Sequence, residues 1–163
     1  ESEKALQNLF EQTYPKNNKL EEILIKVSML DVLYSAGVKF YSLLKMAEHI
    51  KSLGVDNKLS EGNLGVVKEI SLLDGKKFYA FATKYCSFHW QDKYPKYDSN
   101  VDKVLRHFRR VDNFCKSGVQ NMRDYKMYKE ILDVFKSHYK LSKYSYTEID
   151  HYLYQLGKEY FPR

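Results

Sequence analysis

The chain has 163 residues, of which 29% are charged and 15% aromatic, and its 27 Lys and Arg outnumber its 21 Asp and Glu. With only 7 Gly and 3 Pro, this composition excludes a disordered chain and argues against a turn-rich β-sandwich or barrel. No apolar run approaches the roughly 20 residues that a membrane-spanning helix needs. We therefore predict a single all-helical domain over residues 1–163, which could be divided into two helical lobes.

Helical periodicity begins in the first third of the sequence. From Leu20 to Leu33, apolar residues recur at spacings of three and four, and Gly37 marks the end of this helix. A second amphipathic pattern follows Val38, with Phe40, Leu43, Leu44, Ala47 and Ile50 on its apolar side, and stops at Gly54. Residues 60–73 predict one shorter helix, which Gly62 and Gly65 weaken.

The second half of the chain continues the helical pattern. Asp74 and Gly75 indicate a turn, and residues 76–90 predict a central, mostly buried helix. After the break at QDKYPKY, a helix restarts at Asp98 or Ser99, and another is expected over residues 122–141. Ser145 and Glu148 form a capping box before the last helix. Because no segment alternates with period two, we predict an all-α fold of about seven or eight helices and no sheet.

The positive charge is concentrated in one continuous third of the sequence. Residues 84–143 hold 14 Lys and Arg against 7 Asp and Glu, a net of +7, whereas the remainder holds 13 against 14, a net of −1. The sharpest cluster is RHFRR at residues 106–110. A basic segment with interleaved aromatic residues is typical of a surface that binds phosphate backbones, and it is equally typical of a solvated helix face.

Cysteine usage and the first residues of the chain bear on its location. Cys86 and Cys115 fall inside helical patterns and show neither CxxC spacing nor the framework of a secreted domain, so we expect a reducing, cytoplasmic setting. Because the first residues do not form a basic and apolar pattern, we expect no signal peptide. Because the chain begins at Glu1 rather than at Met, we expect that residues precede it.

Several kinds of chemistry find little support in the sequence. The five histidines are scattered without the i, i+4 spacing of a helical zinc site, and no glycine-rich phosphate-binding loop is present, so we expect neither metal nor cofactor. Cys86 and His89, three residues apart, could share a helix face as a thiol and base. A small-molecule enzyme that uses this pair is one hypothesis.

A turn, a helix, a proline-containing loop and an aspartate at the head of the next helix resemble the core of the helix-hairpin-helix GPD superfamily of DNA glycosylases. The segments that carry the resemblance are SLLDGKK at 71–77, YPKYDSNV at 94–101 and the helix pair at 28–50. Together they span roughly residues 20–110. The resemblance implies a domain that binds double-stranded DNA and cleaves the N-glycosidic bond of a modified or damaged base.

The resemblance also assigns roles to individual residues. Asp98 would stabilise the oxocarbenium-like transition state, and Lys77, or Lys84 in its place, would be the nucleophilic amine of a lyase. If neither lysine faces Asp98, the resemblance implies a monofunctional enzyme that uses water. Gly75 and Lys76 of the hairpin would bind the DNA backbone, together with Lys103, Arg106, Arg109 and Arg110 of the basic cluster. The extruded base would be held by flat side chains, namely Tyr85, Phe88, His89, Trp90, Tyr94 and Tyr97.

Each assignment has a structural alternative. Asp98 could simply be the N-cap of its helix, Lys77 a solvated lysine, and the aromatic side chains part of the core. The alternative function is a non-catalytic helical module that binds nucleic acid or a protein partner.

Overall fold

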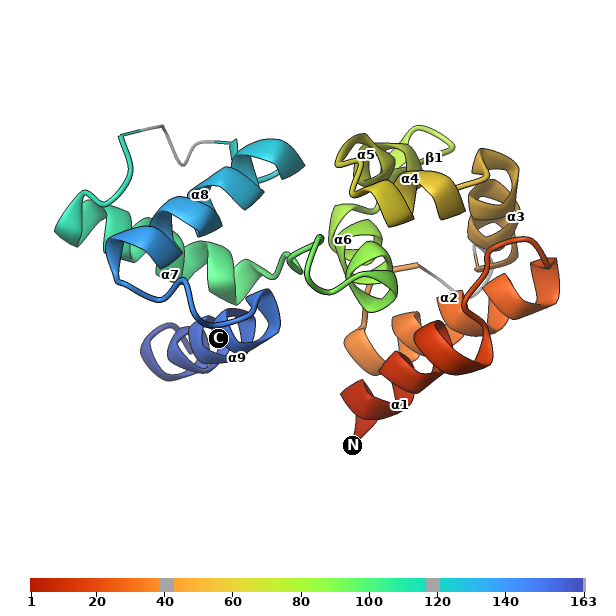
Figure 1. The fold of residues 1–163 in the computed structure, drawn as a ribbon, viewed down its shortest axis with the longest axis horizontal. Coiled ribbons are helices and arrows are strands. Elements are labelled where there is room, and N and C mark those ends of the chain that lie inside the picture. Colours follow the sequence, from red (N-terminus) through yellow and green to blue (C-terminus); the bar gives the residue numbers. More distant parts are fainter. Residues whose placement is uncertain (39–42, 117–120, 163) are drawn as a thin grey trace. The chain divides into compact units, whose positions relative to one another are not determined.

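The computed structural model describes residues 1–38, 43–116 and 121–162. Within these ranges the chain forms nine α-helices, one π-helical turn and a pair of two-residue strands, which confirms the all-α prediction with more helices than expected. The chain divides into two compact units, unit 1 over Glu1–Tyr94 and unit 2 over Pro95–Arg163 (Figure 1). No helix in the described ranges is long and apolar enough to cross a membrane.

Unit 1 contains six of the helices. Its elements in chain order are α1 (Ser2–Asn8), the π-helical turn η1 (Leu9–Thr13), α2 (Leu20–Tyr34), α3 (Leu43–Leu53), α4 (Asp56–Glu61), α5 (Gly65–Ser71), β1 (Leu72–Leu73), β2 (Lys76–Lys77) and α6 (Tyr79–His89). Helix α6 is buried at every position but Ala80, as expected for a central helix, and packs against α2, α5 and η1. The predicted position of Phe40 in the second helix lies outside the described residues.

Two local predictions in unit 1 need correction. The single helix expected over residues 60–73 is in fact α4 and α5, because Gly62 ends α4 in the left-handed conformation at φ +74°. A small sheet is also present, since β1 and β2 pair antiparallel with Leu72 opposite Lys77 and Leu73 opposite Lys76. Asp74 and Gly75 form the predicted turn between them, both at positive φ, as a tight hairpin requires.

Unit 2 contains α7 (Ser99–Asp112), α8 (Tyr125–His138) and α9 (Tyr146–Tyr160). Helices α7 and α9 pack closely, and a Cβ atom built on Gly157 of α9 would lie 2.7 Å from the Cβ of Asn100 on α7. Helix α8 is tied to the start of the unit because Tyr125 and Tyr128 donate hydrogen bonds to the carbonyls of Pro95 (2.8 Å) and Lys96 (2.6 Å). The predicted capping box of Ser145 and Glu148 is present at the start of α9.

Candidate nucleic-acid interface

The polar face of α7 carries a row of cations. Lys103, Arg106 and Arg110 are spaced by three and four residues, so they share one side of the helix, and all three are exposed. The opposite side is formed by Val101, Val104, Leu105 and Phe108, of which the first three are buried. We call Lys103, Arg106 and Arg110 the α7 basic face.

The acidic side chains of unit 2 are largely engaged within the unit. Unit 2 holds 14 Lys and Arg against 9 Asp and Glu, a net of +5 out of +6 for the chain. Six of the nine acids accept hydrogen bonds or pair with cations inside the unit, namely Asp98, Asp102, Asp112, Asp124, Asp133 and Glu148. Arg106 pairs with Asp102, whereas Lys103 makes no hydrogen bond or ion pair to any residue the structure describes. The surplus positive charge is therefore available to an external anion.

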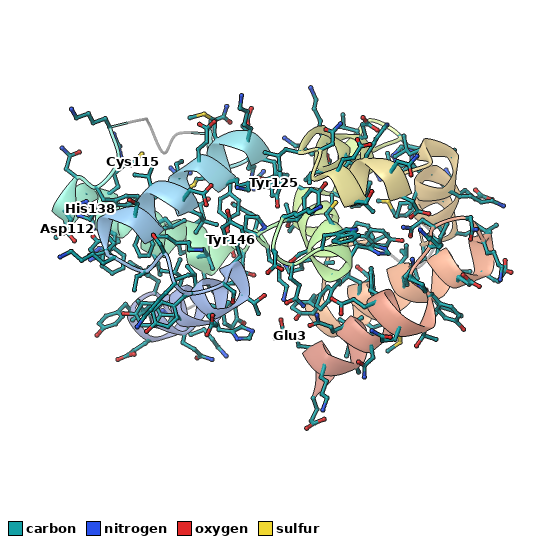
Figure 2. All side chains as sticks on the ribbon, in the orientation of Figure 1. Glu3, Asp112, Cys115, Tyr125, His138 and Tyr146 are labelled. Carbon is teal, nitrogen blue, oxygen red and sulfur yellow. The ribbon has the colours of Figure 1, made fainter. Side chains whose placement is uncertain are left out.

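Arg109, predicted to bind DNA with its neighbours, points elsewhere. Its Nε donates a hydrogen bond to the carbonyl of Cys115 at 2.8 Å, which fixes the chain just after α7 ends. Figure 2 shows Cys115 and Asp112 near His138 at this end of the unit, and Asp112 accepts a hydrogen bond from the hydroxyl of Tyr139. The structure thus gives Arg109 a role within the protein rather than on the α7 basic face.

Asp98 is the N-cap of α7. Its Oδ1 accepts a hydrogen bond from the backbone N–H of Asn100 at 2.8 Å, and its backbone is extended, as an N-cap requires. The restart of the helix at Asp98 or Ser99 is therefore confirmed. The capping role is shown, and a catalytic role for the same carboxylate stays a prediction.

The two candidate lysines belong to unit 1, whereas Asp98 belongs to unit 2. Lys77 is exposed on β2, with its Nζ 5.4 Å from the ring centroid of Tyr79. Lys84 is buried in α6, with its Nζ 5.6 Å from the ring centroid of Tyr34. A pairing of either amine with Asp98 stays a prediction.

The hairpin residues Gly75 and Lys76 are exposed. Gly75 has a φ of +72°, and no atom lies within 4 Å of a Cβ built on it, so the turn is open to solvent. Asp74, next to it, pairs with Lys45 of α3 at 3.0 Å, which anchors the tip of the hairpin to α3. Helices α5 and α6 are therefore joined by a hairpin, and this hairpin is formed by the paired strands β1 and β2.

Most aromatic residues predicted to hold a base lie in the packed interior. Tyr85 and Phe88 have no exposed surface and contact the ring of Phe10 from η1, with centroids 5.1 and 5.6 Å away. The hydroxyl of Tyr94 lies 3.1–3.3 Å from the carbonyls of Lys58, Leu59 and Asn63, at the C-terminal end of α4. These side chains therefore hold unit 1 together.

The other two predicted aromatic residues differ in exposure. Tyr97, 7% exposed, donates to Asp102 at 2.8 Å and packs its ring edge-on against Tyr128 in unit 2. Trp90 is 43% exposed at the end of α6, with the ammonium of Lys93 4.7 Å from its ring centroid. Of the six predicted pocket residues, Trp90 alone is exposed enough to stack on a ligand.

A buried polar cluster in unit 1 was missed by the sequence reasoning. It consists of the buried residues Asn17, Lys26, Tyr85 and His89 and the half-buried Asp56. The Lys26 ammonium donates to Asn17 Oδ1 at 2.7 Å and to the carbonyls of Tyr14 and Lys16 at 3.0 and 2.9 Å. Asn17 Nδ2 donates to Asp56 Oδ1 at 2.7 Å, and the Tyr85 hydroxyl donates to Asn17 Oδ1 at 2.5 Å.

The electrostatics of this cluster do not resemble those of a nucleophilic site. Burial lowers the pKa of Lys26 to about 8, but the ammonium has three oxygen acceptors for its three protons. Burial, and then the Lys26 charge 3.3 Å away, lowers the pKa of His89 well below its usual value. Burial also raises the pKa of the Cys86 thiol, so Cys86 and His89 are held as a neutral thiol and a neutral imidazole, which opposes a thiolate mechanism.

The sequence was compared with known proteins. Residues 1–93 match the family model HI_0787_N, described as an N-terminal domain, and this range ends beside the boundary of unit 1 at Tyr94. A protein of Haemophilus influenzae described as uncharacterized is 34% identical over 149 residues, a match that covers 88% of this chain and 70% of that protein. No solved structure matches the chain significantly.

Proposed function

The chain belongs to the HI_0787_N family, and we propose that it binds nucleic acid through unit 2, the part that follows the family's N-terminal domain. The α7 basic face carries this proposal. Three exposed cations on one side of a helix form a row that can contact successive phosphates, and phosphate contacts supply most of the affinity in non-specific binding. Unit 1 is a much weaker candidate, because its 13 Lys stand against 12 Asp and Glu, a net of +1.

The proposal is tested with two matched triple variants. The α7 triple variant carries Lys103→Gln, Arg106→Gln and Arg110→Gln, and the unit 1 triple variant carries Lys4→Gln, Lys51→Gln and Lys68→Gln, all at exposed positions. Both remove three charges and retain polar side chains. Fluorescence anisotropy with labelled duplex DNA should show weakened binding for the α7 triple variant alone. Equal affinities for the wild type and the α7 triple variant would contradict the proposal.

Base excision is the narrower proposal that the glycosylase resemblance adds. Asp98 is the residue to test, because asparagine caps helices as well as aspartate does. Asp98→Asn should therefore keep α7 and DNA binding while it removes the carboxylate charge that a glycosidic transition state needs. Asp124→Asn, at the N-cap of α8, is the matched control.

The readout is release of free base from duplexes that contain modified or mismatched bases. Release by the wild type and the control, with none by Asp98→Asn at equal binding, would support excision. Equal release by wild type and Asp98→Asn would overturn the catalytic role of Asp98. Binding of every duplex without release would favour the non-catalytic module.

A further inference from the structure

A pocket of about 530 Å³ lies within unit 2, among α7, the C-terminal end of α8, the segment after it, and α9. Its volume falls in the range of about 300–1,000 Å³ that small-ligand sites occupy. None of the residues predicted from the sequence to be catalytic, to bind the DNA backbone or to hold a base lines it. The pocket is therefore a site separate from the α7 basic face and from Asp98.

The pocket has a fixed aromatic floor and exposed aromatic rings at its edge. Phe135 on α8 is buried, with its ring centroid 5.6 Å from Phe108 and 4.7 Å from Tyr139. Tyr144 and Tyr152, which also line the pocket, are 37% and 53% exposed. Exposed tyrosine rings above an aromatic floor are suited to stacking on a flat ligand.

Two lysines belong to the segment between α8 and α9 that carries Tyr144. The ammonium of Lys143 is 4.9 Å from the ring centroid of Tyr144, and Lys140 is exposed on the segment between α8 and α9. Neither lysine pairs with an acid among the described residues. A purely apolar ligand gains nothing from these charges, whereas a flat ligand with an attached phosphate can use both features.

The pocket also presents one carboxylate, that of Glu148. Its Oε2 accepts hydrogen bonds from the backbone N–H and the hydroxyl of Ser145, at 2.8 and 2.9 Å, while its Oε1 accepts none from the part of the chain the structure describes. The bonds from Ser145, with a contribution from the charge of Lys136, lower the pKa of Glu148 and keep it ionised at neutral pH. An ionised Oε1 is an acceptor for an amino group on the ligand.

We propose that this pocket takes an unpaired nucleobase bearing an exocyclic amino group, with Tyr144 and Tyr152 against its faces, Glu148 accepting from the amino group, and Lys140 and Lys143 near the flanking phosphates. The inference rests on the proposed nucleic-acid binding by unit 2 and names the feature of the nucleic acid that unit 2 recognises. Adenine, cytosine and guanine meet the requirement, and thymine does not.

Binding of labelled single strands of oligo-dC and oligo-dT tests the proposal, because cytosine carries the amino group and thymine lacks it. The variants are Tyr152→Ala and Glu148→Gln. Glutamine at this position preserves the capping box, since it also serves at the third position of that motif. The control is Tyr160→Ala, which removes an exposed tyrosine from the same helix away from the pocket.

The wild type should bind oligo-dC more tightly than oligo-dT. Tyr152→Ala should weaken binding of both strands about tenfold, because one stacked base is lost. Glu148→Gln should reduce the preference for oligo-dC, because the amide can also donate to the O4 of thymine. Tyr160→Ala should bind as the wild type does.

Two other outcomes would overturn the inference in distinguishable ways. If the wild type binds both strands equally and Tyr152→Ala has no effect, the pocket takes no base, while salt-sensitive binding through the α7 basic face still stands. If the wild type binds neither these strands nor duplex DNA, the proposed function fails and this inference fails with it.

Discussion

The Lys26 ammonium is a fully buried group in unit 1. It joins the segment at residues 14–17 to α2, because its acceptors are Asn17 and two backbone carbonyls of that segment. Loss of the donor would remove a hydrogen bond from the partly buried carbonyls of Tyr14 and Lys16, whereas Asn17 Oδ1 would keep the bond from the Tyr85 hydroxyl. A buried acceptor left without a hydrogen bond costs about 1–3 kcal/mol.

We expect Lys26→Met, which keeps the aliphatic stem, to lower the free energy of unfolding of unit 1 by about 2–4 kcal/mol. Lys51→Met, at an exposed site on α3, is the matched control and should change it by less than about 0.5 kcal/mol. Denaturant unfolding followed by circular dichroism measures both. Similar small changes in the two variants would show that the Lys26 hydrogen bonds contribute little.

His89 makes the stability of unit 1 sensitive to acid. In the fold, burial and the Lys26 charge keep its imidazole neutral, and Asn17, Tyr85 and Phe10 are its other close neighbours. The unfolded chain takes up a proton near pH 6.5, and the folded chain does so only at much lower pH. Below pH 6.5 the unfolded state therefore binds more protons, and the free energy of unfolding falls as the pH falls.

The expected slope is about 1.4 kcal/mol per pH unit between about pH 6 and pH 5, above the range in which most carboxylates titrate. His89→Gln should remove this slope, because glutamine does not titrate. Denaturation curves at a series of pH values test the prediction. An identical pH dependence in wild type and His89→Gln would refute it.

Of these residues, sequence reasoning identified His89 and Tyr85 but gave them other roles, and it missed Lys26. A signal for Lys26 was present, because it lies three residues after Ile23 and four before Leu30, on the face of α2 that is buried. A lysine in that register predicts a buried charge that needs acceptors. Its acceptors come from a segment without helical periodicity, so the sequence could not name them.

At the scale of elements, α7 and α9 pack against each other with little space at Gly157. A methyl group there would meet the Cβ of Asn100 at 2.7 Å and its backbone oxygen at 3.0 Å. Alanine favours helices over glycine by about 1 kcal/mol, so helix propensity alone predicts a gain from Gly157→Ala. The contact with backbone atoms reverses that expectation.

Gly157→Ala should destabilise unit 2 by about 1–3 kcal/mol, because α9 has to move away from α7. Gln155→Ala, at an exposed position of the same helix, should be close to neutral. Thermal unfolding of the two variants distinguishes the cost of the close contact between α7 and α9 from the gain in helix propensity that alanine brings. An increase in stability for Gly157→Ala would mean that the two helices separate at little cost.

The helices that the sequence predicted well have strong local signals at their ends. Asp98 and the Ser145–Glu148 capping box start α7 and α9 where expected, and α2 ends close to Gly37. The prediction of a single helix over residues 60–73 was wrong because Gly62 adopts a left-handed conformation and ends α4. A glycine in a helical pattern does not reveal by itself whether it continues the helix or ends it.

At the scale of the whole molecule, the chain is divided between a nearly neutral unit 1 and a basic unit 2. The boundary falls at Tyr94 and Pro95, within the segment that the sequence predicted as a break between helices. The family model ends at residue 93, so the same boundary is found independently of the structure. The charge bias pointed to this division, although the basic segment at residues 84–143 begins inside unit 1 and ends inside unit 2.

The pocket in unit 2 could not be found from the sequence. Its walls come from three helices and the segment between α8 and α9, and no single motif contains them. The residues predicted to hold a base all lie in one stretch of the sequence, residues 85–97, and most of them pack into the core of unit 1. Local sequence could indicate a surface rich in charge and aromatic groups, but the cavity depends on how α7, α8 and α9 pack.

The central claim, that unit 2 binds nucleic acid through the α7 basic face, is tested most directly by the salt dependence of duplex DNA binding. Each phosphate contact contributes about 0.9 to the slope of log affinity against log salt concentration. The α7 triple variant should therefore show a slope smaller than the wild type by up to about 3, and the unit 1 triple variant should match the wild type. A wild-type affinity that does not change with salt, or equal slopes in both triple variants, would contradict the account.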